Sequence, residues 1–316
     1  MLLDQDIKKW LANYFDEKVK FDEPMSKHTY FKVGGPAKAF VTPESTEQLY
    51  KLISWSQENN IPYIVIGDGS NLLVSDNGIQ KIVIVLSKCL NRISIIKKEK
   101  ESVLITAMAG VRIQTLCRFA IEEGLSGINF ALGIPGTIGG AIMMNAGTHF
   151  GSISDILESI NIMQSSGDIL KLEKDDIDFS YRGLSLKRKI KTSDSRDPII
   201  LEGSFMLKKS DAIELKKEAE LILKKRNESQ PAKSASAGCF FRNPLTGKTA
   251  GELIDMADLK GARIGGAEIS GKHANFIVNT GNASASDILS LMKLVQETVF
   301  NKFNINLLPE VKIVGV

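Results

Sequence analysis

The sequence predicts an α+β protein with more than one domain, and three features lead to that prediction. The chain has 316 residues, which corresponds to about two domains of ordinary size or three small ones. Hydrophobic residues make up 43% and charged residues 24%, which excludes a disordered chain and a disulfide-rich secreted scaffold. Helical and strand periodicities both occur, in an irregular order that differs from a βαβα repeat.

The N-terminal part predicts a β-α-β type of unit. Trp10, Leu11 and Tyr14 have the spacing of an amphipathic helix, which we expect over residues 1–20. A Gly-Gly-Pro turn follows at 34–36. Short apolar runs ending at turn residues predict strands, and the polar segment between two of them predicts a helix. These expected strands lie at 39–41, 63–66 and 82–86, and the helix at 44–60.

Cap residues mark two further helices. Gly124 is a typical C-terminal cap for a helix over 112–123. Asp211 and Glu214 have a capping spacing that predicts a helix over 211–226, with its lysines on a solvated face. The remaining expected elements are strands at 103–108, 156–163, 169–172, 199–207 and 311–314, a helix at 285–300, and exposed loops at 187–197 and 230–238.

Charge and cysteine content narrow the function classes. Forty Lys and Arg against 37 Asp and Glu give +3, too little to predict a nucleic-acid partner, although a local cationic site for a phosphorylated small molecule is compatible with it. Asp4 and Asp6 interrupt the N-terminus, so no signal peptide is predicted. The three cysteines fit no zinc spacing and suit free thiols in a reducing cytoplasm. They are Cys89, Cys117 and Cys239.

Residues 124–154 contain no charged side chain and are long enough to span a bilayer. Their many glycines and Pro135 would weaken a spanning helix repeatedly and leave backbone groups without partners in lipid. We therefore expect a buried turn-and-helix segment and no membrane insertion.

The segment GDGSN at 67–71 follows an expected buried strand and has the composition of an anion-binding turn. Its glycines allow successive N–H groups to converge on an anionic oxygen, and Ser70 and Asn71 add donors. Leu72 replaces the third glycine of a dinucleotide fingerprint, and no Gly-Lys-Ser/Thr follows. The alternative is a plain tight turn.

A second glycine-rich segment, GIPGTIGGA at 133–141, is followed by Asn145-Ala146-Gly147. We expect Gly139 and Gly140 to lead into a short helix whose N–H groups suit a phosphate. A diphosphate would then lie between this segment and residues 67–71. The alternative is close helix packing through small residues.

Three more positions stand out by residue type. Arg182 follows an aromatic residue and precedes a glycine, so it is either a guanidinium beside an oxyanion or a surface arginine. Cys239 follows a glycine in a loop, as a proton donor or nucleophile or as an inert buried thiol. Glu310 lies between apolar residues that would raise its pKa, unless it is a strand-edge charge. The three histidines are isolated, so no metal site is predicted and His273 is expected to be structural.

Together and in this order, these segments resemble the UDP-N-acetylenolpyruvoylglucosamine reductase family. The short spacing between Arg182 and Cys239 is similar to the family's second type. The resemblance lies in residues 28–36 (HTYFKVGGP), 67–71, 133–147, 180–185 (SYRGLS), 238–244, 270–279 (SGKHANFIVN) and 309–315 (PEVKIVG).

This resemblance implies a three-domain flavoprotein of the vanillyl-alcohol-oxidase type. Residues 1–87 and 88–208 would bind FAD between them, residues 209–303 would form a substrate domain, and a strand within 304–316 would return to the first domain. FAD would be the bound cofactor, NADPH the co-substrate and a UDP-sugar the substrate. A cytoplasmic enzyme of peptidoglycan precursor synthesis is implied, and no obligatory protein partner is inferred.

The implied reaction has two halves. NADPH gives hydride to flavin N5, and the reduced N5 gives it to C3 of the enolpyruvyl ether of UDP-N-acetylglucosamine, forming UDP-N-acetylmuramate. Arg182 and Glu310 match positions that stabilise the enolate, and Cys239 matches a position where most members have a serine that protonates C2. A thiol with pKa ~8.5 is a stronger acid than a serine hydroxyl, so the donor role is chemically sound.

The other implied site residues follow the same match. The FAD diphosphate and ribityl chain would be held by Gly67, Asp68, Gly69, Ser70, Asn71, Gly133, Pro135, Gly136, Thr137, Gly139, Gly140, Asn145 and Gly147. The substrate would be held by Tyr181, Arg226, Gln230 and Asn243, with Arg226 best suited to a diphosphate.

Two other functions fit parts of the pattern. One is a flavin oxidase of the same fold that acts on an alcohol. The other is a non-redox module whose glycine loops bind UDP alone.

Overall fold

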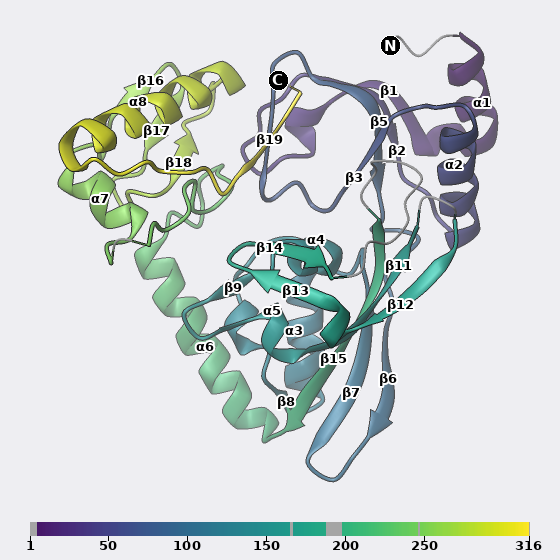
Figure 1. Cartoon of the computed structure of the whole chain (residues 1–316). Coiled ribbons are helices and arrows are strands. Elements are labelled where there is room, and N and C mark those ends of the chain that lie inside the picture. Colours follow the sequence, from purple (N-terminus) through teal and green to yellow (C-terminus); the bar gives the residue numbers. More distant parts are fainter. Residues whose placement is uncertain (1–4, 165–166, 188–197, 246, 316) are drawn as a thin grey trace.

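The computed structural model describes residues 5–164, 167–187, 198–245 and 247–315 and arranges them around three main sheets (Figure 1). Most of the exposed loop predicted at 187–197 lies outside these described residues.

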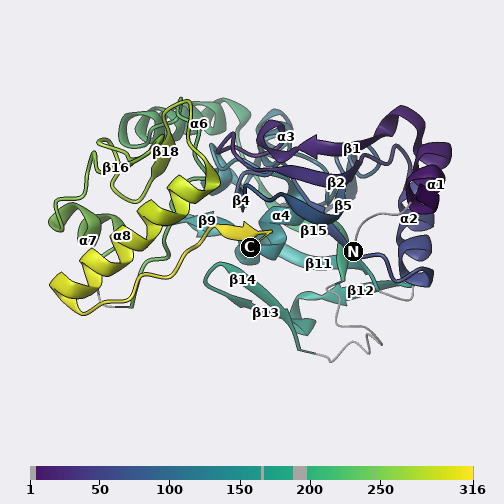
Figure 2. The ribbon, with the colours of Figure 1, turned by 90° about the horizontal axis from the view of Figure 1, so that it is seen from above.

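The first sheet is mixed and carries the N-terminal helices on one face. Its strand order is β1-β2-β5-β3, in which β1 is antiparallel and the others run parallel. The helices α1 (Gln5–Phe15) and α2 (Thr46–Glu58) lie beside this sheet (Figures 1 and 2). The strands span Val19–Pro24, Pro36–Val41, Ile79–Val85 and Tyr63–Ile66, in sheet order.

The helix predicted over residues 1–20 is too long, and β1 was not predicted. The helix ends at Phe15 because Asp16 adopts a left-handed φ of 50° and begins a 3-10 turn. The following strand has only Val19 and Glu23 buried, and it is an edge strand, where charged residues are common. Its short polar sequence therefore carries too little periodicity to reveal a strand.

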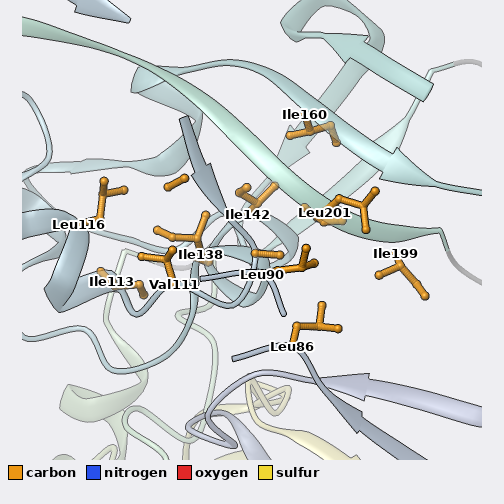
Figure 3. Packing of buried hydrophobic residues seen from close by; sticks show 14 of the residues in the cluster. Leu86, Leu90, Val111, Ile113, Leu116, Ile138, Ile142, Ile160, Ile199 and Leu201 are labelled. Atoms are coloured by element: carbon orange, nitrogen blue, oxygen red, sulfur yellow. The ribbon is translucent and has the colours of Figure 1, made fainter. Parts of the chain in front are cut away.

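The second sheet is antiparallel and forms the largest part of the core. Its order is β12-β11-β15-β7-β6, with the short β8 paired to β15. The helices α3 (Ile113–Glu122) and α4 (Ile138–Met143) belong to the same core, and Ile142 of α4 lies beside Leu201 of β15 (Figure 3). The strands span Ile169–Glu173, Leu157–Met163, Ile199–Lys209, Ser102–Met108, Ile93–Lys98 and Leu125–Ser126, in the order just given.

The charge-free segment 124–154 is divided into short pieces. Besides β8 and α4 it contains a 3-10 turn (Asn129–Ala131), β9 (Gly147–Thr148) and β10 (Gly151–Ser152), and it leads into α5 (Ile153–Ile156). Within the described ranges, no helix combines the length and apolar character needed to cross a membrane.

A long helix, α6 (Ala212–Ser229), leads to the third sheet (Figure 1). Asp211 caps it by accepting hydrogen bonds from the N–H groups of Ile213 and Glu214, and it continues three residues beyond the predicted end. The third sheet is covered by α7 (Ala250–Met256) and α8 (Ala285–Phe303). Its strands are β16 (Arg263–Ile264), β17 (Ala267–Ile269) and β18 (Ile277–Asn279).

The C-terminal strand β19 (Lys312–Val314) crosses back and pairs in parallel with β4 (Leu72–Val74), the strand that follows residues 67–71 (Figures 1 and 2). A hairpin of β13 (Ile177–Ser180) and β14 (Gly183–Leu186) completes the set of strands. The return of the chain end places residues far apart in sequence next to the 67–71 loop.

Asp76 lies between β4 and β5 and binds the start of α8. Its carboxylate accepts hydrogen bonds from Ala285 N (2.8 Å), Ser286 N (2.9 Å) and the Ser286 hydroxyl (2.6 Å). Burial acts to raise the pKa of Asp76, but these hydrogen bonds outweigh it and the net pKa is lowered.

We predict that Asp76→Ala lowers the free energy of unfolding by about 1 kcal/mol at pH 7. Because the folded pKa of Asp76 is depressed, its contribution is present above the ordinary Asp value of about 3.9 and disappears as pH falls through the folded pKa. Urea titrations from pH 7 to 3 should show the two proteins converging in acid. Glu297→Ala, within α8, is the control. An equal loss of unfolding free energy in that variant would contradict the prediction.

Candidate active site

Arg182 lies in the two-residue turn of the β13–β14 hairpin. Ser180 pairs with Gly183, which leaves Tyr181 and Arg182 in the turn, and Arg182 has a left-handed φ of 57°. Such a conformation costs a non-glycine residue about 1 kcal/mol. The guanidinium is held from two sides, because Nε donates to Glu310 Oε1 at 2.7 Å and Nη2 donates to the Gly147 carbonyl at 3.0 Å.

Glu310 is a largely buried carboxylate whose backbone is fixed by two segments. Its N–H donates to the Phe240 carbonyl at 2.8 Å, and its carbonyl accepts from the Asn71 side chain at 3.2 Å. Burial raises the pKa of the carboxyl, and Arg182 followed by Arg242 opposes the shift without reversing it. Protonation of Glu310 is therefore easier than for a free carboxyl.

Cys239 lies one residue before the Phe240 carbonyl that binds Glu310. Burial raises the pKa of its thiol to about 11, the charge of Glu310 adds to this, and Arg182 and Arg226 oppose it. Glu310 N binds the carbonyl of Phe240, the residue next to Cys239, and the Glu310 carboxylate binds Arg182, so the fold brings Arg182, Cys239 and Glu310 into one site. Gly238 before it has a φ of 82° and nothing within 4 Å of the place where a side chain would begin.

The four predicted substrate residues surround this group. Burial, followed by the charge of Glu310, raises the pKa of Tyr181, while a hydrogen bond from the Asn243 backbone lowers it. Arg226 Nη2 donates to Gln230 Oε1 at 3.2 Å, and burial lowers the pKa of Arg226. The Asn243 side chain accepts from the Ala250 N–H at 3.0 Å, which gives it a structural role as well.

The 67–71 loop has the free donors that an anion needs. Among the described residues, the N–H groups of 68–71 have no hydrogen-bond acceptor, while the Gly69 and Asn71 carbonyls accept from Tyr30 and Lys312. A side chain at Gly69 would begin 2.0 Å from the His28 carbonyl, so only glycine fits there. This row of N–H groups without partners suits a diphosphate.

Asp68 differs from the other loop residues because its carboxylate is already paired. It forms an ion pair with Arg112 Nε at 3.1 Å. A carboxylate repels a diphosphate, so Asp68 can offer only its N–H group to such a ligand.

The second glycine-rich segment contacts this loop directly. The Ser70 hydroxyl donates to the Pro135 carbonyl at 3.0 Å, and side chains at Gly67 and Gly136 would begin 2.5 Å from Thr137 Oγ1 and 2.9 Å from Ser70 Oγ. Gly133 faces Arg226, since a side chain there would begin 2.8 Å from Arg226 Nε. The two glycine segments therefore lie together, next to the site formed by Arg182, Cys239 and Glu310.

The expected entry into α4 needs a correction. The helix begins at Ile138, so Gly139 and Gly140 lie within its first turn. Gly139 donates to the Ala109 carbonyl and packs against that residue, whereas Gly140 is exposed. Asn145 Oδ1 accepts from Ser154 N at 3.0 Å, and Gly147 supplies the carbonyl that binds Arg182.

A cavity of about 560 Å³ lies beside Gly67 and Asp68 but includes none of Arg182, Cys239 and Glu310. The cavity and the group of ionisable residues are therefore distinct features. Its lining includes Lys18, Lys20, Lys27, Lys32, Lys88 and Arg112.

Two further residues belong to the site, and the sequence marks no role in it for Arg242. Arg242 is near enough to Glu310 to affect its pKa, and its Nε is buried without a hydrogen-bond partner among the described residues. Asn275 binds the backbone on the C-terminal side of Cys239 through its side chain. The sequence predicts Asn275 as a residue that anchors the strand after it, which is β18, but it does not predict these hydrogen bonds to Phe241.

Comparison with known proteins bears directly on this geometry. A model described as an FAD binding domain matches residues 37–173, and the model of the UDP-N-acetylenolpyruvoylglucosamine reductase C-terminal domain matches residues 230–314. The chain is 44% identical over 313 residues to UDP-N-acetylenolpyruvoylglucosamine reductase of Desulfosudis oleivorans, covering 99% of this chain and 100% of the relative. The chain belongs to the UDP-N-acetylenolpyruvoylglucosamine reductase family.

Two further relatives agree with this assignment. The Clostridium tetani reductase is 42% identical, over 98% of this chain and 96% of the relative. The crystal structure of the Thermus caldophilus reductase superposes with a TM-score of 0.74 at 34% identity, covering 94% of this chain and 98% of that one.

The family assignment confirms the predicted α+β FAD-binding fold, the FAD cofactor and an oxidoreductase that acts on a CH–CH group. It argues against a non-redox UDP-binding module and against an alcohol oxidase, because the relatives that match over the full length are reductases.

We predict that Cys239 remains protonated well above neutral pH. Because burial raises its pKa to about 11, alkylation by iodoacetamide should still be accelerating at pH 10, whereas a free thiol levels off above about pH 9. Peptide mass spectrometry after timed alkylation would follow Cys239 separately from Cys89 and Cys117. A rate that levels off below pH 9 would contradict the raised pKa.

Proposed function

We propose that this chain is an FAD-dependent, NADPH-using UDP-N-acetylmuramate dehydrogenase. It would reduce the enolpyruvyl ether of UDP-N-acetylglucosamine in the cytoplasm, during peptidoglycan precursor synthesis. The observation that carries the proposal is the partly buried Arg182–Glu310 ion pair beside the protonated Cys239 thiol, in contact with the 67–71 loop and its free N–H groups.

The residues present fit the cofactor. The free N–H groups of residues 68–71 would bind the FAD diphosphate, and Gly140 leaves the opposite side open. Residues 1–87 and 88–208 would hold FAD between them, and residues 209–303 would bind the sugar nucleotide. The bound flavin would supply the hydride chemistry, with NADPH as the hydride donor and C3 of the enolpyruvyl group as the acceptor.

Arg182 and Glu310 stabilise the charge that the reaction creates. Hydride addition at C3 places an electron pair on C2 and the adjoining carboxylate of the substrate. The Arg182 guanidinium would bind that carboxylate, and Glu310, with its raised pKa, would donate a hydrogen bond in its protonated form. The unpaired Nε of Arg242 would be satisfied by an acceptor on the substrate.

Cys239 completes the reaction as the proton donor. The C2 electron pair takes the thiol proton, a C–H bond forms, and the resulting thiolate recovers a proton from solvent. Tyr181, Arg226, Gln230 and Asn243 would orient the sugar nucleotide, with Arg226 bound to its diphosphate.

The function is tested by an absorbance titration of the purified holoenzyme. The protein should be yellow, NADPH should bleach the flavin band, and the enolpyruvyl sugar nucleotide should restore it without oxygen. Restoration by oxygen and an alcohol, with no response to the sugar nucleotide, would favour the oxidase alternative instead.

We predict that Cys239→Ala leaves flavin reduction by NADPH within about threefold and slows reoxidation by the substrate by at least about a hundredfold. Cys239→Ser should retain substantial activity, because a hydroxyl can also donate a proton. Stopped-flow absorbance measures each half-reaction, with Cys89→Ala as the matched control. Equal loss in both half-reactions would make Cys239 a structural residue.

We predict that Glu310→Gln also separates the two half-reactions. The amide keeps a hydrogen-bond donor but cannot form an ion pair with Arg182. Reoxidation should therefore slow by about tenfold to a thousandfold while FAD stays bound. Flavin content after gel filtration and stopped-flow reoxidation measure these effects. Unchanged reoxidation would exclude Glu310 from the chemistry.

A further inference from the structure

We propose that Asn275 is a positioning residue that holds Cys239 at the correct depth for protonating C2. This inference rests on the proposed function. Asn275 does not touch the reacting atoms, and it would act through the backbone that follows Cys239.

Asn275 binds that backbone with three hydrogen bonds. Its carbonyl accepts from Phe240 N at 2.7 Å, its Oδ1 accepts from Phe241 N at 2.9 Å, and its Nδ2 donates to the Phe241 carbonyl at 2.8 Å. Asn275 is only 3% exposed, and Phe240 and Phe241 are fully buried. Water cannot replace these bonds at a buried site. The side-chain amide therefore binds Phe241 N–H and C=O as the backbone of a neighbouring strand would.

The opposite side of the same segment is bound by the chain that carries Glu310. The Phe240 carbonyl accepts from Glu310 N at 2.8 Å, and Arg242 N donates to the Leu308 carbonyl at 2.9 Å. The segment after Cys239 therefore lies between Asn275 and Glu310. The backbones of Cys239 and Glu310 are therefore held by one set of hydrogen bonds, and Asn275 supplies those on the side away from Glu310.

The two Phe241 groups need a side chain of this length that offers one acceptor and one donor, which the amide of Asn275 does at every pH. Ionised aspartate has acceptors alone and would face the Phe241 carbonyl with a negative oxygen, whereas protonated aspartate again offers one acceptor and one donor. Alanine would leave a buried N–H and a buried C=O without partners, so the segment would shift. A displacement of about 1 Å at a reacting group can cost about a hundredfold in rate.

Two substitutions test the proposal in the holoenzyme. Asn275→Ala should slow substrate-dependent reoxidation by about tenfold to a hundredfold at every pH and leave flavin reduction by NADPH unchanged. Asn275→Asp should be equally slow at pH 9 but recover toward wild type as pH falls through the raised pKa of the buried aspartate. Rates are taken as ratios to wild type at each pH, by stopped-flow absorbance.

A control separates positioning from general stability. Asn279 is also a buried asparagine, at the end of β18, and its side chain binds the Phe31 carbonyl, far in sequence from Cys239. Asn279→Asp should lower thermal stability without changing the ratio of the two half-reactions. The rate of iodoacetamide reaction at Cys239 should rise in Asn275→Ala and stay constant in Asn279→Asp.

Each outcome decides the question. Reoxidation of Asn275→Ala within threefold of wild type, equal loss in both half-reactions, or no acid recovery of Asn275→Asp would overturn the proposal. If the alanine variant does not fold, the aspartate variant at low pH keeps both bonds and gives the decision alone. Wild-type protein that bleaches but is not reoxidised by the enolpyruvyl compound would instead refute the proposed function.

Discussion

The ion pair between Arg182 and Glu310 is the interaction on which the site depends. Both side chains are mostly withdrawn from water, with 22% and 14% of their side-chain surface exposed. A buried charge whose partner is removed is strongly unfavourable, so each of these residues requires the other. The pair also joins the β13–β14 hairpin to the C-terminal segment, 128 positions away in sequence. The left-handed turn at Arg182 is tolerated because this pair and the Gly147 carbonyl hold its guanidinium.

A chain of backbone contacts links this pair to both glycine loops. Asn71 binds the Glu310 carbonyl, and Glu310 N binds Phe240. Ser70 binds Pro135 in the second glycine segment. The crossing of β19 to β4 makes these contacts possible, because it brings the chain end to the 67–71 loop. A ligand that binds this loop is therefore linked to Glu310 and Cys239 through a few hydrogen bonds and the short stretches of backbone between them.

The sequence predicted the segments of the site better than their mutual arrangement. Strong periodicity and cap residues predict the helix over 211–226 to within a few residues of α6. The composition of the glycine loops predicts ligand contacts, and this stays a prediction. The strand β1 was missed because an edge strand needs few apolar residues, and the helix start at Ile138 was missed because glycines at 139–140 are poor helix formers. The grouping of Arg182 with Glu310 came only from the family resemblance, since no local rule links residues so distant. The hydrogen bonds of Asn275 to Phe241 depend on how two segments 34 positions apart align in the fold, and no local pattern in the sequence predicts that alignment.

The thiol at position 239 has a physical consequence of its own. Burial and the nearby Glu310 shift its pKa to about 11, further from neutral than that of a free thiol. The group therefore carries its proton throughout the neutral range, which the proposed role as a proton donor requires. The thiolate is the form that reacts with oxidants and alkylating agents, so the raised pKa also limits damage to the residue. The environment that would suit a proton donor thus also protects the thiol. A Cys239 that gives up its proton in a turnover would be left as a strongly basic thiolate, and this basicity would favour the return of a proton from solvent.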